Sequence, residues 1–261
     1  MVEEENEDRD PARAATGPRR LRICELPAQA EICWVSGHRP STLPRDHHPF
    51  PQPRCASRVG ASALCFHMIL GLTGGIGCGK STAAALFEHQ GFRRLDADAT
   101  IRHAVLTQPA VLQALRERYG DAILAPDGSV NRPELAARVF PHETELRWLE
   151  ALTHPPLFAL WRAAFAAEPK ARWAVEVPLL FEKRLENWFD FTICVASAPL
   201  QQLVRLEQRG LPRALAEQRI SKQLPLAHKI ESADFVLWND GKPEFLAAQV
   251  SRLIDSLSTG R

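Results

Sequence analysis

Short apolar runs alternate with longer amphipathic stretches from residue 68 onward. Five apolar runs predict buried parallel strands at residues 68–73, 92–96, 173–177, 191–195 and 235–238, the second being the weakest. The stretches between them have helical periodicity and predict helices at residues 81–89, 99–106, 111–119, 143–167, 200–208, 213–223 and 244–257. Strands separated by helices in this order imply right-handed crossovers. The sequence therefore predicts an α/β fold with a parallel sheet covered by helices on both faces.

Residues 1–67 have a different composition from the rest of the chain. They hold 8 of the 20 prolines and no lysine, open on an acidic cluster, and show no sustained helical or strand period. Proline fixes φ and removes a backbone donor, and scarce apolar runs leave too little buried surface to offset the entropy of ordering. We therefore expect residues 1–67 to be a disordered or mis-assigned N-terminal extension, and residues 68–261 to form the folded domain.

Charge and cysteine content narrow the class of protein. The chain has 32 Lys+Arg against 31 Asp+Glu, and this near-neutrality argues against a nucleic-acid scaffold or a polybasic membrane binder. No apolar run approaches the ~18 to 20 residues of a membrane-spanning helix, and no signal-peptide pattern opens the chain. The six cysteines form no C-x-x-C pair, so we expect free thiols. These features predict a cytoplasmic protein with no nucleic-acid or membrane partner.

A phosphate-binding loop is the strongest chemical signal. The segment Gly74-Gly75-Ile76-Gly77-Cys78-Gly79-Lys80-Ser81 is a complete G-x-x-x-x-G-K-S pattern between a predicted strand and a predicted helix. Glycines let the backbone amides turn inward, and the following helix adds its positive N-terminal end, so together they cradle nucleotide phosphates. We expect ATP to bind residues 75–82, which are Gly75, Ile76, Gly77, Cys78, Gly79, Lys80, Ser81 and Thr82, with Lys80 on the phosphates and Ser81 on Mg²⁺. The alternative is a glycine-rich turn that only joins strand to helix.

Two carboxylates after the next strand favour a kinase. The chain has neither the N-K-x-D segment of a GTPase nor an apolar strand ending in D-x-x-G. It does have two carboxylates, Asp96 and Asp98, where the second strand should end. Ligands of open α/β sheets bind at the carboxyl ends of strands, so both acids would face the γ-phosphate. One acid can accept the proton of an attacking hydroxyl while the other orients Mg²⁺; we assign Asp98 to the first role and Asp96 to the second. An aspartate helix cap is the competing interpretation, and capping by Asp96 is compatible with catalysis by Asp98.

From residue 68 onward the chain resembles the dephospho-coenzyme A kinase family. The family's G-L-T-G-G-I-G-x-G-K-S-T is present at residues 71–82, its D-A-D-x-x-x-R at residues 96–102, and its histidine-proline at His154-Pro155. Its V-P-L-L-F-E matches residues 177–182, and its Q-x-x-R-x-x-x-R matches Gln202, Arg205 and Arg209, followed by Gln223, Ala233-Asp234 and the N-x-G of residues 239–241.

This resemblance implies a P-loop kinase with a five-stranded parallel core, a helical substrate-binding insertion and a lid. It also implies transfer of the γ-phosphoryl of ATP to the ribose 3′-hydroxyl of dephospho-coenzyme A, a small-molecule substrate, by a monomer or small homo-oligomer. Arg205 and Arg209 would clamp phosphate oxygens from one helix face, with solvated surface arginines as the alternative. Asp96, Arg102 and His154 would bind the acceptor.

Several positions leave alternatives open. His154 is equally suited to capping a helix or packing in the core. Asn239, which we expect at the adenine, is equally suited to a plain turn. Cys78 stands where the family most often has serine; because the loop binds through backbone amides, we expect ATP binding to survive, and a lowered thiolate pKa is a further hypothesis. Glu176 stands where Asp would be expected, and Trp238 where a small polar residue is frequent. Another nucleotide kinase, or a P-loop regulatory protein without an acceptor, is the competing function.

Overall fold

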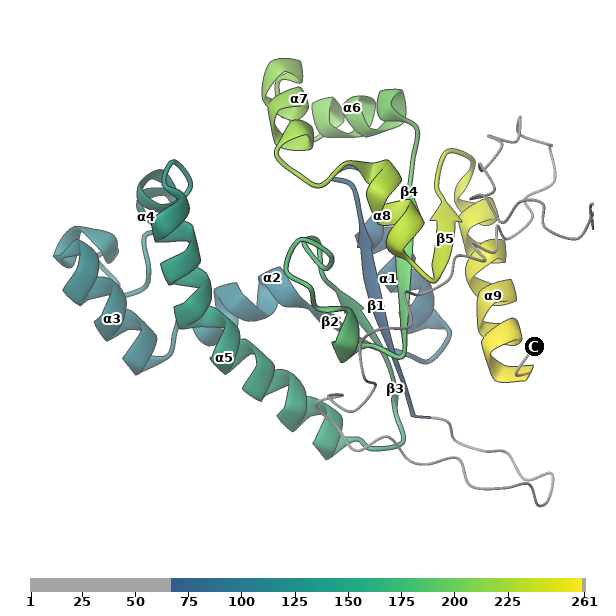
Figure 1. Ribbon diagram of the computed structural model, residues 1–261, viewed down its shortest axis with the longest axis horizontal. Coiled ribbons are helices and arrows are strands. Elements are labelled where there is room, and N and C mark those ends of the chain that lie inside the picture. The colour runs from purple at the N-terminus through teal and green to yellow at the C-terminus, as the bar shows by residue number, and fades with distance from the viewer. Residues whose placement is uncertain (1–66, 260–261) are drawn as a thin grey trace, which may run out of the picture. The chain divides into compact units, whose positions relative to one another are not determined.

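The computed structural model describes residues 67–259, so the expectation for residues 1–67 falls almost entirely outside the described part of the chain. Five strands form one parallel sheet in the order β2-β3-β1-β4-β5 (Figure 1). They are β1 Met68–Gly74, β2 Arg93–Asp96, β3 Arg172–Glu176, β4 Phe191–Ala196 and β5 Phe235–Trp238. All four strand pairings are parallel, which confirms the predicted fold class.

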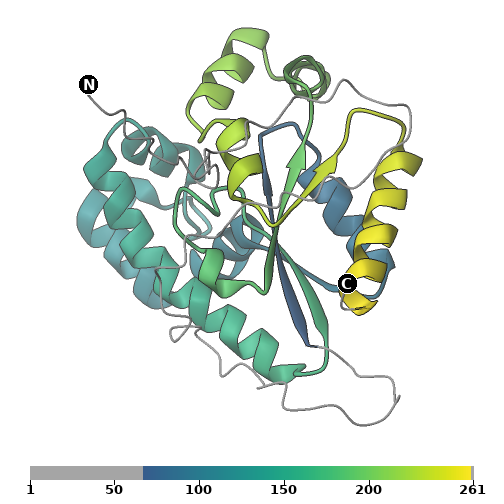
Figure 2. The ribbon, with the colours of Figure 1, turned by 45° about the vertical axis from the view of Figure 1, so that its right-hand side comes forward.

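The central strand β1 is buried on both faces because it reads as an uninterrupted apolar run. Leu70 and Leu72 point to one face and pack with Phe87 of α1 and Leu253 of α9, whereas Ile69 points to the other face and packs with Trp161 of α5. The helices cover both faces of the sheet, with α1 and α9 side by side (Figure 2). Their bounds are α1 Lys80–His89, α2 Ala97–Thr100, α3 Pro109–Tyr119, α4 Arg132–Val139, α5 Glu143–Ala167, α6 Pro199–Gln208, α7 Arg213–Ser221, α8 Leu226–Ser232 and α9 Pro243–Thr259.

A helical insertion between β2 and β3 contains α3, α4 and α5 (Figure 1). It is tied together by Glu145 of α5, whose carboxylate accepts two hydrogen bonds from the Arg118 guanidinium, both at 2.7 Å, and one from the Tyr119 hydroxyl. Arg138 of α4 donates to the Tyr119 carbonyl at 2.8 Å. The three helices of the insertion are therefore joined to one another by polar contacts as well as by the apolar core.

Three helical segments differ from the sequence expectation. The helix predicted at residues 99–106 is α2 followed by a π-helical turn, Ile101–Val105, in which the Leu106 amide bonds the Ile101 carbonyl at 2.9 Å. Helices α4 and α8 were not predicted. Both are short, and Lys229 of α8 points into the core with none of its surface exposed, which breaks the apolar stripe that identifies a helix. Among the described residues, no helix combines the length and apolarity needed to cross a membrane.

Candidate active site

The phosphate loop connects β1 to α1 and can be built only with glycine at three positions, the first of which is Gly74, where φ is 142° and a Cβ would collide with the Val195 carbonyl oxygen. Gly77 and Gly79 have φ of 80° and 90°. A Cβ added at Gly77 would lie 2.8 Å from the backbone oxygen of Gln202, and one at Gly79 would lie 2.2 Å from Nδ2 of Asn239. The loop is therefore packed directly against α6 and the segment after β5.

Lys80 places its ammonium group inside the loop. Its Nζ donates to the carbonyl oxygens of Gly74 at 3.1 Å and Gly75 at 3.0 Å. Burial lowers the pKa of Lys80, and the nearby Lys229 ammonium lowers it further, while Cys78 and Glu176 act in the opposite direction. Ser81 and Thr82 are exposed in the first turn of α1, where their hydroxyls are accessible.

The hypothesis of a reactive Cys78 is wrong. The side chain is completely buried, and this burial raises the pKa of its thiol despite the opposing charges of Lys80 and Arg205. Its carbonyl oxygen, by contrast, is used by the structure, because Nδ2 of Asn239 donates to it at 2.9 Å. Residue 78 thus contributes backbone and packing.

A network of hydrogen bonds joins the loop to α6 and to the residues that follow β4 and β5. Nη1 of Arg205 donates to the Gly77 carbonyl at 3.3 Å and to Oγ of Ser197 at 2.9 Å, and that hydroxyl donates to the Asn239 carbonyl at 2.9 Å. Nε2 of Gln202 donates to the Ser197 carbonyl at 3.0 Å. These contacts bring the predicted residues Arg205 and Asn239 to the phosphate loop.

Asp96 and Asp98 lie at the carboxyl end of β2, as predicted. Oδ1 of Asp96 accepts from the Ala99 amide at 2.9 Å, so Asp96 caps α2. Asp98 follows in the first turn of that helix, on the solvent side. Desolvation raises the pKa of Asp98, and the charge of Asp96 raises it further, whereas Arg102 and Lys80 lower it. These mutual effects place Asp96, Asp98 and Lys80 within one electrostatic neighbourhood.

Glu176 ends the neighbouring strand β3 and is 3% exposed. Its Oε1 accepts from Nε of Arg94 at 2.8 Å and lies 2.6 Å from Nη2 of the same guanidinium. A buried carboxylate requires such a partner, since an unpaired charge is costly to desolvate. The longer side chain at the position where Asp would be expected is therefore accommodated by an arginine of the edge strand.

The other predicted site residues have different surroundings. Nε of Arg102 donates to the Asp98 carbonyl at 3.1 Å, from the π-helical turn after α2. His154 is half-buried in α5 against the ring of Phe158, and burial lowers its pKa. Arg209 is the exposed C-cap of α6. The structure thus brings Arg102 into contact with Asp98, whereas Arg209 lies beyond the end of α6, away from the buried contacts of Arg205.

Comparison with known proteins assigns the family. The family model described as dephospho-CoA kinase matches residues 68–244. The chain belongs to the dephospho-CoA kinase family. A dephospho-CoA kinase of Thermosynechococcus vestitus is 43% identical over 193 residues, covering 73% of this chain and 95% of that protein. The corresponding protein of Anaeromyxobacter dehalogenans is 41% identical over 197 residues, covering 74% and 93%.

Solved structures agree with the family. TT1252 from Thermus thermophilus superposes with a TM-score of 0.65 at 32% identity, covering 73% of this chain and 98% of that one. Dephospho-CoA kinase from Campylobacter jejuni gives a TM-score of 0.56 at 25% identity, covering 74% and 98%. The predicted P-loop kinase fold and the resemblance to the dephospho-CoA kinase family are confirmed.

Sequence reasoning missed the residues that hold this kinase site in shape. Arg94 gave no signal because its partner Glu176 lies 82 residues further along the chain. Ser197 and the contact of Gln223 with the loop were also not foreseen, since Oε1 of Gln223 accepts from the Ile76 amide across 147 residues. The family motif contained Gln223, but no pattern in the sequence indicated its target.

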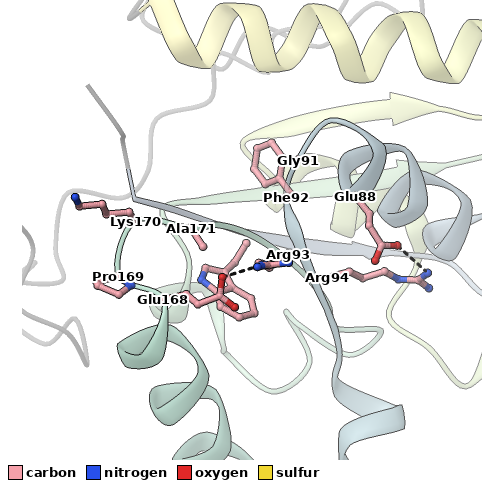
Figure 3. Close-up of a pocket in the computed structure, with 10 residues that line it drawn as sticks. Glu88, Gly91, Phe92, Arg93, Arg94, Glu168, Pro169, Lys170 and Ala171 are labelled. Atoms are coloured by element: carbon pink, nitrogen blue, oxygen red, sulfur yellow. Dashed lines mark hydrogen bonds and ion pairs between the residues drawn. The ribbon is translucent and has the colours of Figure 1, made fainter. Parts of the chain in front are cut away.

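A surface pocket of about 850 Å³ lies elsewhere, between the start of β2 and the connection from α5 to β3 (Figure 3). Two ion pairs lie along its wall: Nε of Arg93 is 2.8 Å from Oε2 of Glu168, and Nη1 of Arg94 is 4.0 Å from Oε2 of Glu88. It adjoins the first residues of β2, whereas the phosphate loop and Asp96 lie at the carboxyl ends of their strands. The pocket is therefore separate from the kinase site.

Proposed function

We propose that this protein phosphorylates the ribose 3′-hydroxyl of dephospho-coenzyme A with ATP, producing coenzyme A and ADP in the last step of coenzyme A biosynthesis. The observation that carries the proposal is a complete phosphate loop that holds the Lys80 ammonium, with Asp96 and Asp98 at the carboxyl end of β2, in a chain of the dephospho-CoA kinase family. In this reaction the O3′–H bond breaks, oxygen bonds to the γ-phosphorus, and ADP leaves with the electrons of the broken P–O bond.

The phosphate loop, residues 75–82, would bind ATP through its backbone amides other than that of Ile76, which donates to Oε1 of Gln223. Lys80 supplies a positive charge to the transferring phosphoryl, which matters most in a site that excludes water. Arg205, fixed at the Gly77 carbonyl, and Arg209 would neutralise charge that moves to the leaving phosphate. Asn239 would contribute to the nucleotide site from its place against Gly79.

Asp98 would act as the general base that takes the proton from the acceptor hydroxyl. Desolvation and the charge of Asp96 raise the pKa of Asp98, so its carboxylate is a better proton acceptor than an ordinary aspartate, while Arg102 and Lys80 favour the ionised form that a base requires. Asp96, Arg102 and His154 would bind the acceptor. Desolvation keeps His154 neutral near neutral pH, so it would act there by hydrogen bonding.

Mg²⁺ fits this arrangement of side chains. Within residues 67–259 no cluster of three or more His, Cys, Asp or Glu side chains forms a self-sufficient metal site. Mg²⁺ in kinases is held by one or two protein oxygens together with substrate phosphates and water, so a larger cluster is not required. The exposed Ser81 hydroxyl and Asp96, whose Oδ1 is used as a cap, would hold it. When bound, Mg²⁺ neutralises charge on the β- and γ-phosphates.

We place this reaction in the cytoplasm, in a monomer or small homo-oligomer without nucleic-acid or membrane partners. The near-neutral net charge supports the absence of a polyanionic partner. The thiols of Cys78 and Cys194 are free, which is typical of a reducing compartment. Sedimentation of the full chain would give its oligomeric state.

A coupled assay for ADP formation tests the proposed function. Purified full-length protein receives ATP and Mg²⁺ with dephospho-coenzyme A, with a panel of nucleosides and nucleotides, or with no acceptor. We expect acceptor-dependent ADP release with dephospho-coenzyme A and a product that carries phosphate on the 3′ position. Faster turnover of another acceptor would assign a different kinase specificity, and ATP binding without any acceptor-dependent turnover would favour a regulatory P-loop protein.

A further inference from the structure

The connection between α7 and α8 reaches over to the phosphate loop. Gln223 lies in this connection, and its Oε1 accepts a hydrogen bond from the Ile76 amide at 3.0 Å. Figures 1 and 2 show the connection passing beside the carboxyl end of β1, where the loop begins. No other side chain in the described part of the chain has a hydrogen bond to the Ile76 amide.

This hydrogen bond determines which way the Gln223 amide faces. A backbone N–H can only donate, so the oxygen of the side chain must be the atom that faces Ile76. The remaining group, Nε2, carries two hydrogens and is held beside the loop. Within the described residues no acceptor takes these hydrogens, and the side chain is partly open to solvent. Gln223 therefore presents a free donor next to the site where phosphates bind.

A buried ion pair fixes the position of this connection. Oε1 of Glu182, which follows β3, accepts from the amide of Leu224 at 3.1 Å and lies 2.8 Å from Nζ of Lys229. Nζ of Lys229 also donates to the Pro178 carbonyl at 2.8 Å, and this lysine is fully buried. The residue directly after Gln223 is thus anchored to the protein core. A donor held in place in this way has little orientational entropy left to lose.

We propose that Gln223 is a further catalytic residue, whose Nε2 donates a hydrogen bond to the transferring phosphoryl group while its Oε1 stays on Ile76. The phosphoryl group in flight spreads negative charge over its equatorial oxygens, and a pre-positioned neutral donor stabilises that charge more than the ground state. Glu182 and Lys229 are positioning residues in this arrangement. The inference rests on the phosphoryl transfer of the proposed function, but it does not depend on which alcohol accepts the phosphoryl group.

Two substitutions separate the donor from the contact with the loop. Gln223→Glu keeps an oxygen for the Ile76 amide but loses the donor, and Gln223→Met keeps the length of the side chain but loses both. Gln218→Glu, on the exposed surface of α7, is the matched control for the added negative charge. Each protein is titrated with ADP and Mg²⁺, with and without aluminium fluoride, which mimics the transferring phosphoryl group, and kcat and KM are measured with dephospho-coenzyme A.

We expect aluminium fluoride to tighten ADP binding by the wild type and the Gln218→Glu control. Both Gln223 variants should lose ~10-fold or more of that gain, and a similar factor in kcat, because one donor to a developing charge is removed. Their affinity for ADP alone and their melting temperatures should stay near wild type.

Unchanged tightening in Gln223→Glu would overturn the inference and leave Gln223 as a strap between the connection and the loop. The inference would also be overturned if the variants lost as much affinity for ADP alone as for ADP with aluminium fluoride. It would be overturned as well if aluminium fluoride did not tighten ADP binding by the wild type. Failure of dephospho-coenzyme A as a substrate, with the aluminium fluoride effects intact, would instead count against the proposed acceptor.

Discussion

At the scale of single residues, the side chains of Lys80 and Cys78 have different surroundings in the phosphate loop. The charge of Lys80 is held inside the loop by two carbonyl oxygens, whereas the Cys78 thiol is buried away from it and only the backbone of residue 78 takes part in the loop. We therefore expect the side chain to be essential at residue 80 and replaceable at residue 78.

Lys80→Ala should cost far more activity than Cys78→Ser. Loss of a positive charge at the transferring phosphoryl lowers kcat by ~10² or more, whereas serine preserves the amide and nearly the volume of residue 78. Steady-state kinetics on both variants measure this contrast. Comparable losses of kcat would mean that the buried thiol has a function that its surroundings do not indicate.

Asp98→Asn should abolish most phosphoryl transfer while ATP still binds. The amide keeps the shape of the side chain but removes the basic lone pair, and loss of a general base is worth ~10² to 10⁴ in rate. Single-turnover rates and ATP titrations together test this assignment. If Asp96→Asn is inactive with intact nucleotide and Mg²⁺ affinity while Asp98→Asn is active, the two roles must be exchanged.

The acidic limb of the pH–rate profile should report Asp98. The base works only when ionised, so kcat falls as the pH decreases through its pKa, which partial desolvation and the charge of Asp96 hold above the ordinary aspartate value. Arg102 lowers that pKa, so Arg102→Gln should move the acidic limb to higher pH. Glu176 raises it, so Glu176→Gln should move the limb to lower pH. Shifts in the same direction for both variants would disconnect the limb from Asp98.

At the scale of elements, the described strands and most helices could be predicted because their signals are local. The apolar run of β1 is complete within 7 residues, the helical period of α5 within 25, and the phosphate loop within eight. Helix α8 could not be predicted in this way, since Lys229 occupies a core position whose partner Glu182 lies 47 residues earlier. The contacts of Arg94 and Gln223 could not be predicted for the same reason, because their partners also lie far away along the chain.

The ion pair of Lys229 and Glu182 should be strongly coupled to stability. Lys229→Met leaves a partly buried carboxylate that retains one backbone donor, and breaking such a pair costs about 3–5 kcal/mol. The double variant Lys229→Met with Glu182→Leu should recover much of that loss. Lys183→Met, which breaks the more exposed pair with Glu150, is the matched control and should cost about 1 kcal/mol or less. Urea unfolding measures all three, and equal losses for Lys229→Met and Lys183→Met would contradict the expectation.

At the scale of the whole molecule, the folded kinase domain is proposed to begin at residue 68. The family match starts at residue 68, and β1 begins at Met68, paired with Arg172 of β3. Every residue assigned to the site lies after this point. We therefore propose that the kinase fold and its site need nothing from the first 67 residues.

A chain that starts at Met68 should retain the melting temperature and the kcat of the full-length protein. Calorimetry and the coupled assay on the two chains test this, with expression and purification matched. Loss of folded, active protein on removal of residues 1–67 would assign those residues a structural or catalytic contribution.

Gly77 illustrates how one position can be constrained twice. Its positive φ turns the loop toward the nucleotide, and the missing side chain leaves room for the backbone of Gln202. A related protein that no longer bound ATP would not need the positive φ at Gly77. It would still need the missing side chain at this position to keep α6 in place. Lys80 has no comparable role in the fold, because within the described residues its Nζ donates only to two carbonyl oxygens of the loop. Among relatives that have lost ATP binding, we therefore expect the lysine to be replaced first and the glycine to be retained because of its packing.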